Sequence, residues 1–143
     1  MYSTGKPLSV LVFAKPDRLS DALISLLSGM QMIKEINRIE DPQQAIKMIA
    51  SKEIDLVLLD MLSDEAGITT LIPRIKLAYQ NTYCLSVVDT VRLARVSQSC
   101  GADHVLLRGF SGNELLDVII KAQTHHGLRE TKTAELSPLY VLE

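Results

Sequence analysis

Five short apolar runs alternate with five amphipathic segments along this chain of 143 residues. The apolar runs span residues 8–14, 32–39, 54–60, 82–88 and 104–107. Between and after them, hydrophobic residues recur at the three- and four-residue spacing of a helix that buries one face. Strict alternation of strands and helices predicts an α/β domain, in which helices cover both faces of a parallel sheet.

Local signals mark several helix ends. Asp41 followed by Pro42 predicts the N-cap and the first residue of the second helix. Gly29 is predicted to end the first helix. Pro73 lies within the apolar stripe of residues 68–79. Because proline is poorly tolerated in a helix interior, we expect that helix to begin late enough to place Pro73 in its first turn.

Composition narrows the class of protein. The chain is 47% hydrophobic and 22% charged, which is typical of a globular domain. Its net charge of −2 gives no overall attraction to nucleic acid or to an anionic membrane. The sequence contains neither a membrane-length apolar stretch nor a signal-peptide core, so we expect a cytoplasmic protein. Cys84 and Cys100 lack metal-type spacing and are expected to fill the core.

Polar residues stand where the predicted strands end. Lys15 follows the first strand, Asp60 ends the third, Ser86 lies near the end of the fourth and Arg108 follows the fifth. Sites in open parallel sheets form beyond the carboxyl ends of the strands, so these four side chains are the candidate site. Together they could bind an oxyanion or a phosphate group. The alternative is that they are ordinary polar residues where the strands reach solvent.

The segments "DLVLLD" and "GADHVLLRGF" resemble those of response-regulator receiver domains, the CheY-like domains of two-component signalling. The resemblance spans residues 8–123 and implies a flavodoxin-like (βα)5 three-layer sandwich with a five-stranded parallel sheet of order 2-1-3-4-5. It implies that Asp60 is the phosphoacceptor and Ser86 the switch hydroxyl. Arg108 stands where the family has a phosphate-stabilising lysine. We assign residues 1–124 to the domain and 125–143 to a C-terminal tail, disordered or packed on a partner.

Two positions depart from the family pattern. The acidic pair that holds magnesium would fall at Ala14 and Lys15, and the aromatic switch residue would fall at Val105. Magnesium needs several oxygen ligands, so we expect no metal site, with Asp60 and Asp17 as weak candidate ligands. We also expect Lys15 to form an ion pair with Asp60 and to lower the pKa of that carboxyl.

The resemblance and the departures favour a non-enzymatic, atypical receiver without cofactors, which relays signals by protein–protein contact with weak or no dependence on phosphorylation. Its partners would include a histidine kinase or an output protein. The implied contact surface, which can also form a homodimer, is Val91–Gln123. Its expected exposed contacts are Arg92, Arg95, Asn113, Asp117 and Lys121.

Two alternatives stay open. In the first, Asp60 accepts phosphate from a histidine kinase with Mg²⁺ on unusual ligands, and the domain controls a downstream DNA-binding output domain. In the second, the domain binds a small molecule whose anionic group is held by Lys15 and Arg108. Against the second, "AKPDRL" after the first strand has no glycine for a phosphate loop. Direct DNA binding is not expected, because the chain after residue 122 is too short for a helix-turn-helix.

Overall fold

The structure, a computed structural model, describes residues 6–125. Its elements are β1 (Leu8–Phe13), α1 (Arg18–Ser28), β2 (Ile33–Ile39), α2 (Pro42–Ser51), β3 (Leu56–Leu62), α3 (Glu65–Ala78), β4 (Tyr83–Val88), α4 (Val91–Ser99) and β5 (His104–Leu107). A further helix over residues 112–125 is called the C-terminal helix below. Apart from residue 125, the predicted tail lies outside the described residues. No helix within residues 6–125 has the length and apolarity needed to cross a membrane.

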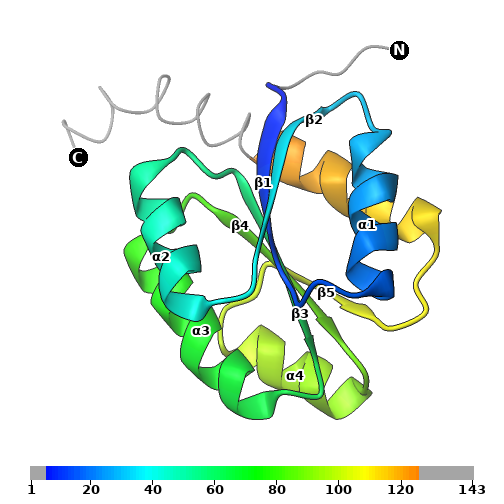
Figure 1. The fold of residues 1–143 in the computed structure, drawn as a ribbon. Coiled ribbons are helices and arrows are strands. Elements are labelled where there is room, and N and C mark those ends of the chain that lie inside the picture. The colour runs from blue at the N-terminus through cyan, green and yellow to red at the C-terminus, as the bar shows by residue number, and fades with distance from the viewer. Residues whose placement is uncertain (1–5, 126–143) are drawn as a thin grey trace, which may run out of the picture.

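The five strands form one parallel sheet in the order β2-β1-β3-β4-β5, which confirms the predicted flavodoxin-like architecture. Strand β3 is central, and β2 is an edge strand with partly exposed side chains, both as expected. Helix α1 and the C-terminal helix cover one face, whereas α2, α3 and α4 cover the other (Figure 1). The carboxyl ends of all strands therefore meet at one edge of the sheet.

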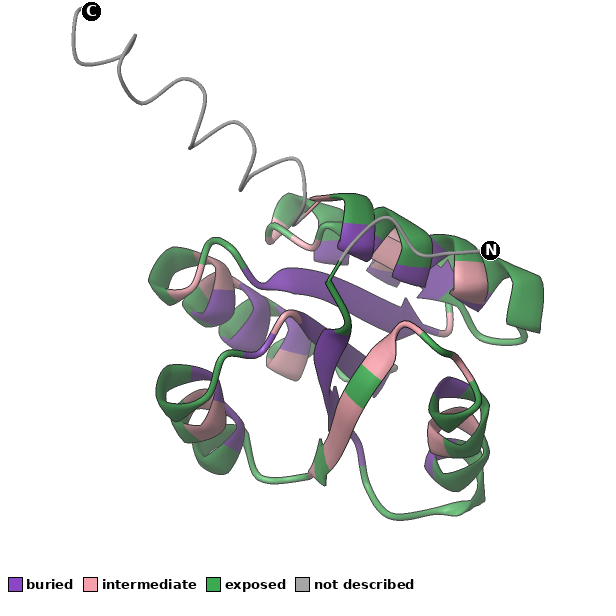
Figure 2. Cartoon of the chain, turned by 90° about the horizontal axis from the view of Figure 1, so that it is seen from above, coloured by how far each residue is buried: buried purple, intermediate pink, exposed green. Residues whose placement is uncertain are grey.

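The core has two layers, one on each face of the sheet. Alternate residues of β3 enter opposite layers: Leu56 and Leu58 pack toward α1 and the C-terminal helix, whereas Val57 and Leu59 pack toward α2, α3 and α4. Figure 2 shows the strands mostly buried and the helices exposed on their outer sides. Strands buried on both faces explain the continuous apolar runs of the sequence.

The two cysteines belong to the core, as the sequence predicts. Cys84 is fully buried in the layer beside α2, α3 and α4, and the half-buried Cys100 packs against the same layer. Both thiols are free. Each behaves as a small apolar side chain.

Helix α3 contradicts the expectation for Pro73, which lies in the helix interior and not in its first turn. The helix begins after Asp64, whose side chain accepts a hydrogen bond from a first-turn amide. Three buried side chains precede the proline, namely Ile68, Leu71 and Ile72. Burial stabilises each by about 1.5–3 kcal/mol, and together they outweigh the cost of about 3 kcal/mol for an interior proline.

The Gly-Ala-Asp turn before β5 has a structural role at the amino end of the sheet. Asp103 Oδ2 accepts hydrogen bonds from the Cys84 amide at 2.8 Å and from Lys76 Nζ at 2.7 Å. Lys76 Nζ also donates to the Thr82 carbonyl at 2.9 Å. The side chains of Lys76 and Asp103 are only 19% and 22% exposed. This ion pair therefore ties α3 to the start of β4 and to the turn before β5.

Candidate functional site

Asp60 lies near the carboxyl end of β3, half-buried and opposite Val87 of β4. Leu56 and Leu58 face the α1 layer, so Asp60, two residues further along, faces that layer too. Its side chain lines a cavity that is also lined by α1 and by residues 108–110, which follow β5. Asp60 thus lies at the predicted strand end, and its carboxyl group lines this cavity.

The environment of Asp60 disfavours its ionised form. Burial is the largest cause that raises the pKa of Asp60 above its ordinary value, and the negative charge of Asp17 adds to it. The guanidinium of Arg108 lowers the pKa in part, whereas Asp89 raises it again. Among the described residues, the charges that act on the Asp60 carboxyl are thus two carboxylates and one guanidinium.

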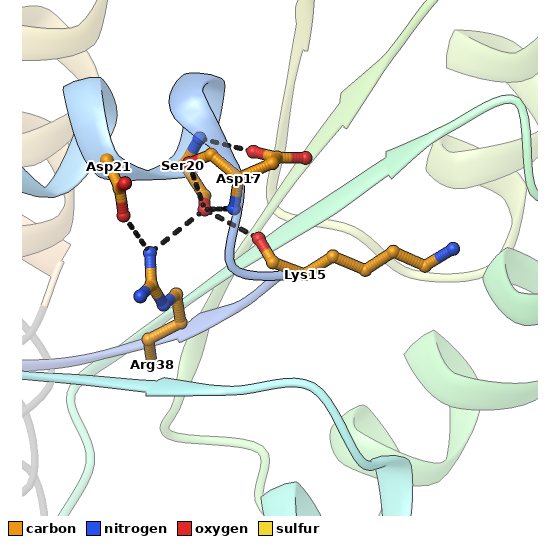
Figure 3. A network of polar contacts seen from close by, with 5 residues as sticks. All are labelled: Lys15, Asp17, Ser20, Asp21 and Arg38. Atoms are coloured by element: carbon orange, nitrogen blue, oxygen red, sulfur yellow. Dashed lines mark hydrogen bonds and ion pairs between the residues drawn. The ribbon is translucent and has the colours of Figure 1, made fainter.

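Lys15 does not play the part expected for it. Within residues 6–125 it forms no ion pair with Asp60, and the expectation that it lowers the pKa of that carboxyl is wrong. The Lys15 carbonyl accepts a hydrogen bond from Ser20 Oγ at 2.6 Å, and its side chain extends away from this network (Figure 3). The Lys15 side chain is exposed, and the pKa of Asp60 is raised by burial and by the neighbouring acids, against the opposing charge of Arg108.

Asp17 is the N-cap of α1. Its Oδ1 accepts a hydrogen bond from the Ser20 amide at 2.8 Å, and its own amide donates to Ser20 Oγ at 3.2 Å, which completes a capping box. The hydrogen bond from the Ser20 amide is the main cause that lowers the pKa of Asp17. Arg38 of β2 donates to Ser20 Oγ at 3.1 Å and also contacts Asp21 (Figure 3). Asp17 is thereby held as a carboxylate near Asp60.

The acids near Asp60 do not form a set that suits magnesium. Within the described part of the chain, no three His, Cys, Asp or Glu side chains are placed to hold a metal ion. Asp17, a weak candidate ligand with Asp60, uses Oδ1 as a helix cap. Asp89 is paired with Arg108. Magnesium requires near-octahedral oxygen coordination, which this donor set does not offer.

Asp89 is a site residue that the sequence analysis missed. It directly follows β4, and its Oδ1 lies 3.5 Å from Arg108 Nη1. That oxygen is buried and has no hydrogen-bond partner within residues 6–125. The Arg108 amide donates to the Val88 carbonyl at 2.8 Å, which holds the two strand ends together. The available signal was an acidic residue placed directly after a predicted strand.

The structure does not bring Ser86 to Asp60. Ser86 lies opposite Leu59, one residue before the position that faces Asp60, and Val87 takes that place. Ser86 is fully buried, and its hydroxyl forms a hydrogen bond of 3.0 Å with the Ser97 hydroxyl of α4. A step of one residue along a strand reverses the face on which a side chain lies.

Val105, at the expected aromatic position, is half-buried and packs against the core layer beside α4. The expected contact residues of the Val91–Gln123 surface are all exposed: Arg92, Arg95, Asn113, Asp117 and Lys121. Arg92 Nη2 donates to Glu65 of α3 at 2.7 Å. Three large apolar side chains on the same segment are also exposed, namely Val91, Leu107 and Ile120.

The strand order β2-β1-β3-β4-β5 defines a flavodoxin-like fold, which receiver domains share. Solved structures agree: NtrX from Brucella abortus, in complex with ADP, has a TM-score of 0.79 at 18% identity, and the match covers 91% of this chain and 29% of NtrX. The signal receiver domain of an HD domain-containing protein from Pseudomonas fluorescens has a TM-score of 0.76 at 23% identity, covering 92% and 97% of the two chains. A putative response regulator from Chloroflexus aurantiacus has 0.74 at 20% identity, covering 83% and 99%.

These structural similarities establish the fold alone, and the chain spans less than a third of NtrX. The sequence matches no protein-family model and no curated protein.

In the Asp17→Asn variant we expect the pKa of Asp60 to fall. Asparagine caps a helix as well as aspartate does, whereas the negative charge that raises the pKa of Asp60 is removed. The measurement is the carboxyl ¹³C shift of Asp60 as a function of pH. Asp21→Asn is the matched control, because Asp21 pairs with Arg38. An unchanged Asp60 titration in Asp17→Asn would show that the two charges do not interact.

Proposed function

We propose that this chain is an atypical receiver domain that acts by protein–protein contact, with little or no dependence on phosphorylation. The receiver fold supports a role in signal transduction. The observation that carries the proposal is the charge around Asp60, where two further acids face a single guanidinium. Phosphoryl transfer to a carboxylate brings two anions together and needs cations to neutralise them.

The other parts of a phosphorylation switch are also displaced. Arg108 is engaged with Asp89, and the hydroxyl of Ser86 bonds to Ser97 on the far face of the sheet. Val105 is a small apolar side chain in place of an aromatic one. The proposal therefore includes no metal-dependent chemistry, and Asp60 is not phosphorylated as part of the proposed function.

The surface proposed for partners is the Val91–Gln123 segment. Its exposed apolar side chains, Val91, Leu107 and Ile120, lie among charged residues, which is the composition expected of a contact surface. The partner would be a histidine kinase, an output protein or a second copy of the domain. Charge reversal at Arg95 and Lys121 that leaves such association unchanged would remove this surface from the proposal.

The test is a two-dimensional amide NMR titration with magnesium and beryllofluoride, which mimics an aspartyl phosphate. We expect no saturable shifts around Asp60 and Arg108 at millimolar-scale reagent. The Asp60→Asn variant is the control, because it keeps the shape of the side chain but cannot bind beryllofluoride covalently. Addition of magnesium alone separates metal binding from the formation of the mimic.

The opposite outcome favours a phosphorylatable receiver. Its supporting observation is that Asp60 and Arg108 line the same cavity, which gives a phosphoryl group one cation to contact. Saturable shifts that require magnesium and vanish in Asp60→Asn would establish this reading. They would also overturn the proposal of phosphorylation-independent contact.

A further inference from the structure

A cavity of about 300 Å³ lies between α1 and the segment that follows β5. Its lining is mostly apolar and consists of Leu19, Ala22, Leu23, Leu26, Val87, Gly109 and Phe110, together with the polar Asp60 and Arg108. This volume is at the lower end of the range for small-molecule sites, which are typically apolar with a few placed polar groups. The cavity also lies at the carboxyl ends of the strands, where ligands bind in open α/β sheets.

Two apolar side chains on the rim are unusually exposed. Leu19 is 56% exposed and Leu26 is 43% exposed. They lie two turns apart on the same face of α1, and both line the cavity. Asp21 of the same helix forms an ion pair with Arg38 of β2. Leucines that remain exposed at the mouth of a cavity are surface that an apolar ligand would cover.

The charges around Asp60 and Arg108, at the polar end of the cavity, determine which ligand charge is favoured. Asp60 makes no hydrogen bond within residues 6–125, and the charges that shift its pKa are those of Asp17, Arg108 and Asp89. Two negative charges and one positive charge therefore act on Asp60, and Arg108 is shared with Asp89 at 3.5 Å, so the net charge around Asp60 is negative. An anion is disfavoured here, and the apolar walls offer no oxygen ligands to complete a metal site.

We propose that this cavity binds a small organic cation, an ammonium group on an alkyl or aryl body. The ammonium donates to the Asp60 carboxylate, and the body lies against the leucines of α1 and Phe110. This site goes beyond the proposed function, because occupancy does not depend on phosphorylation of Asp60. It would let a small molecule bind the domain at the carboxyl ends of the strands, opposite the turn that contains Asp103.

The experiment compares three probes of equal length by amide NMR titration of the protein. Hexylammonium is expected to shift the amides of residues 19–26 and 108–110 and to bind about tenfold more tightly than hexan-1-ol, in line with a charge-assisted hydrogen bond. Hexanoate is expected to bind more weakly than the alcohol. Equal affinities for the three probes, or shifts outside these segments, would overturn the proposal.

Two variants divide the contributions. Asp60→Asn is expected to abolish the preference for hexylammonium over hexan-1-ol while retaining the alcohol. Ala22→Phe places an aromatic ring from an exposed position of α1 into the cavity and is expected to abolish binding of both. Ala50→Phe, at an exposed position of α2, is the matched control and should bind as the unaltered protein does. Unchanged binding in Ala22→Phe contradicts this site.

The two proposals fail separately. Beryllofluoride shifts that disappear in Asp60→Asn overturn phosphorylation independence and leave the cation site standing. Absence of any preference for hexylammonium overturns the cation site and leaves the proposed receiver function standing.

Discussion

Replacing Asp103 by alanine is expected to lower the free energy of unfolding by about 3 kcal/mol. The carboxylate accepts hydrogen bonds from the Cys84 amide and from Lys76 Nζ, both in a poorly solvated place. Alanine leaves the amide without its partner and leaves a cation that is 19% exposed without its counter-charge. The unsatisfied amide of the buried Cys84 and the unpaired charge of the partly buried Lys76 each add to this cost.

The measurement is urea unfolding followed by circular dichroism, at constant pH. The stability of Asp103→Asn should lie between those of the unaltered protein and Asp103→Ala. The asparagine side-chain oxygen still accepts a hydrogen bond from the Cys84 amide, but it carries no negative charge to pair with Lys76. Asp117→Ala, at an exposed position of the C-terminal helix, is the control and should change stability by less than about 0.5 kcal/mol. A loss in Asp103→Ala as small as that of the control would mean that the Asp103 contacts contribute little.

Asp60→Asn is expected to act in the opposite direction and to stabilise the folded protein at neutral pH. The pKa of Asp60 is raised in the folded state, chiefly by burial, so its ionised form is less favourable there than in the unfolded chain. Below the ordinary pKa of 3.8 both states hold the proton and the penalty is absent. As pH rises through the folded-state pKa the penalty becomes complete, and asparagine avoids it.

The measurement is the midpoint of thermal unfolding at a series of pH values. The gain in Asp60→Asn should be largest near neutral pH and should vanish in acid. Asp41→Asn, which changes an exposed N-cap of α2 to another good cap, is the control for a general effect of losing an acid. Destabilisation of Asp60→Asn at neutral pH would show that the carboxylate is a structural group after all.

These two acids differ because of where their partners lie. Asp103 has an amide and an ammonium within hydrogen-bond distance, whereas Asp60 has no hydrogen bond within residues 6–125 and two like charges nearby. An acid whose charge disfavours the fold is a candidate functional group, since packing alone does not require it. That contrast supports placing the proposed cation site at Asp60.

Much of the fold follows from local patterns. The alternation of apolar runs with helical stripes specifies a parallel sheet covered on both faces, and Asp41 with Pro42 marks the start of α2 correctly. The solid apolar run before Asp60 predicts a central strand with an acid at its tip. Each of these rests on residues within one turn or one strand, where periodicity and capping are local properties.

Other features needed the tertiary structure. Counting along the chain placed Ser86 at the site, but pairing of β3 with β4 sets it opposite Leu59, and one residue of register reverses its face. The interior position of Pro73 depends on how deeply α3 packs against the sheet.

The site itself was decided in the same way. The raised pKa of Asp60 depends on desolvation and on charges in the segments that follow β1, β4 and β5, so sequence distance gives no measure of it. The alternation of residue types therefore determined the sheet and the place of the acid. The packing of distant segments decided which side chains surround that acid and what it can bind.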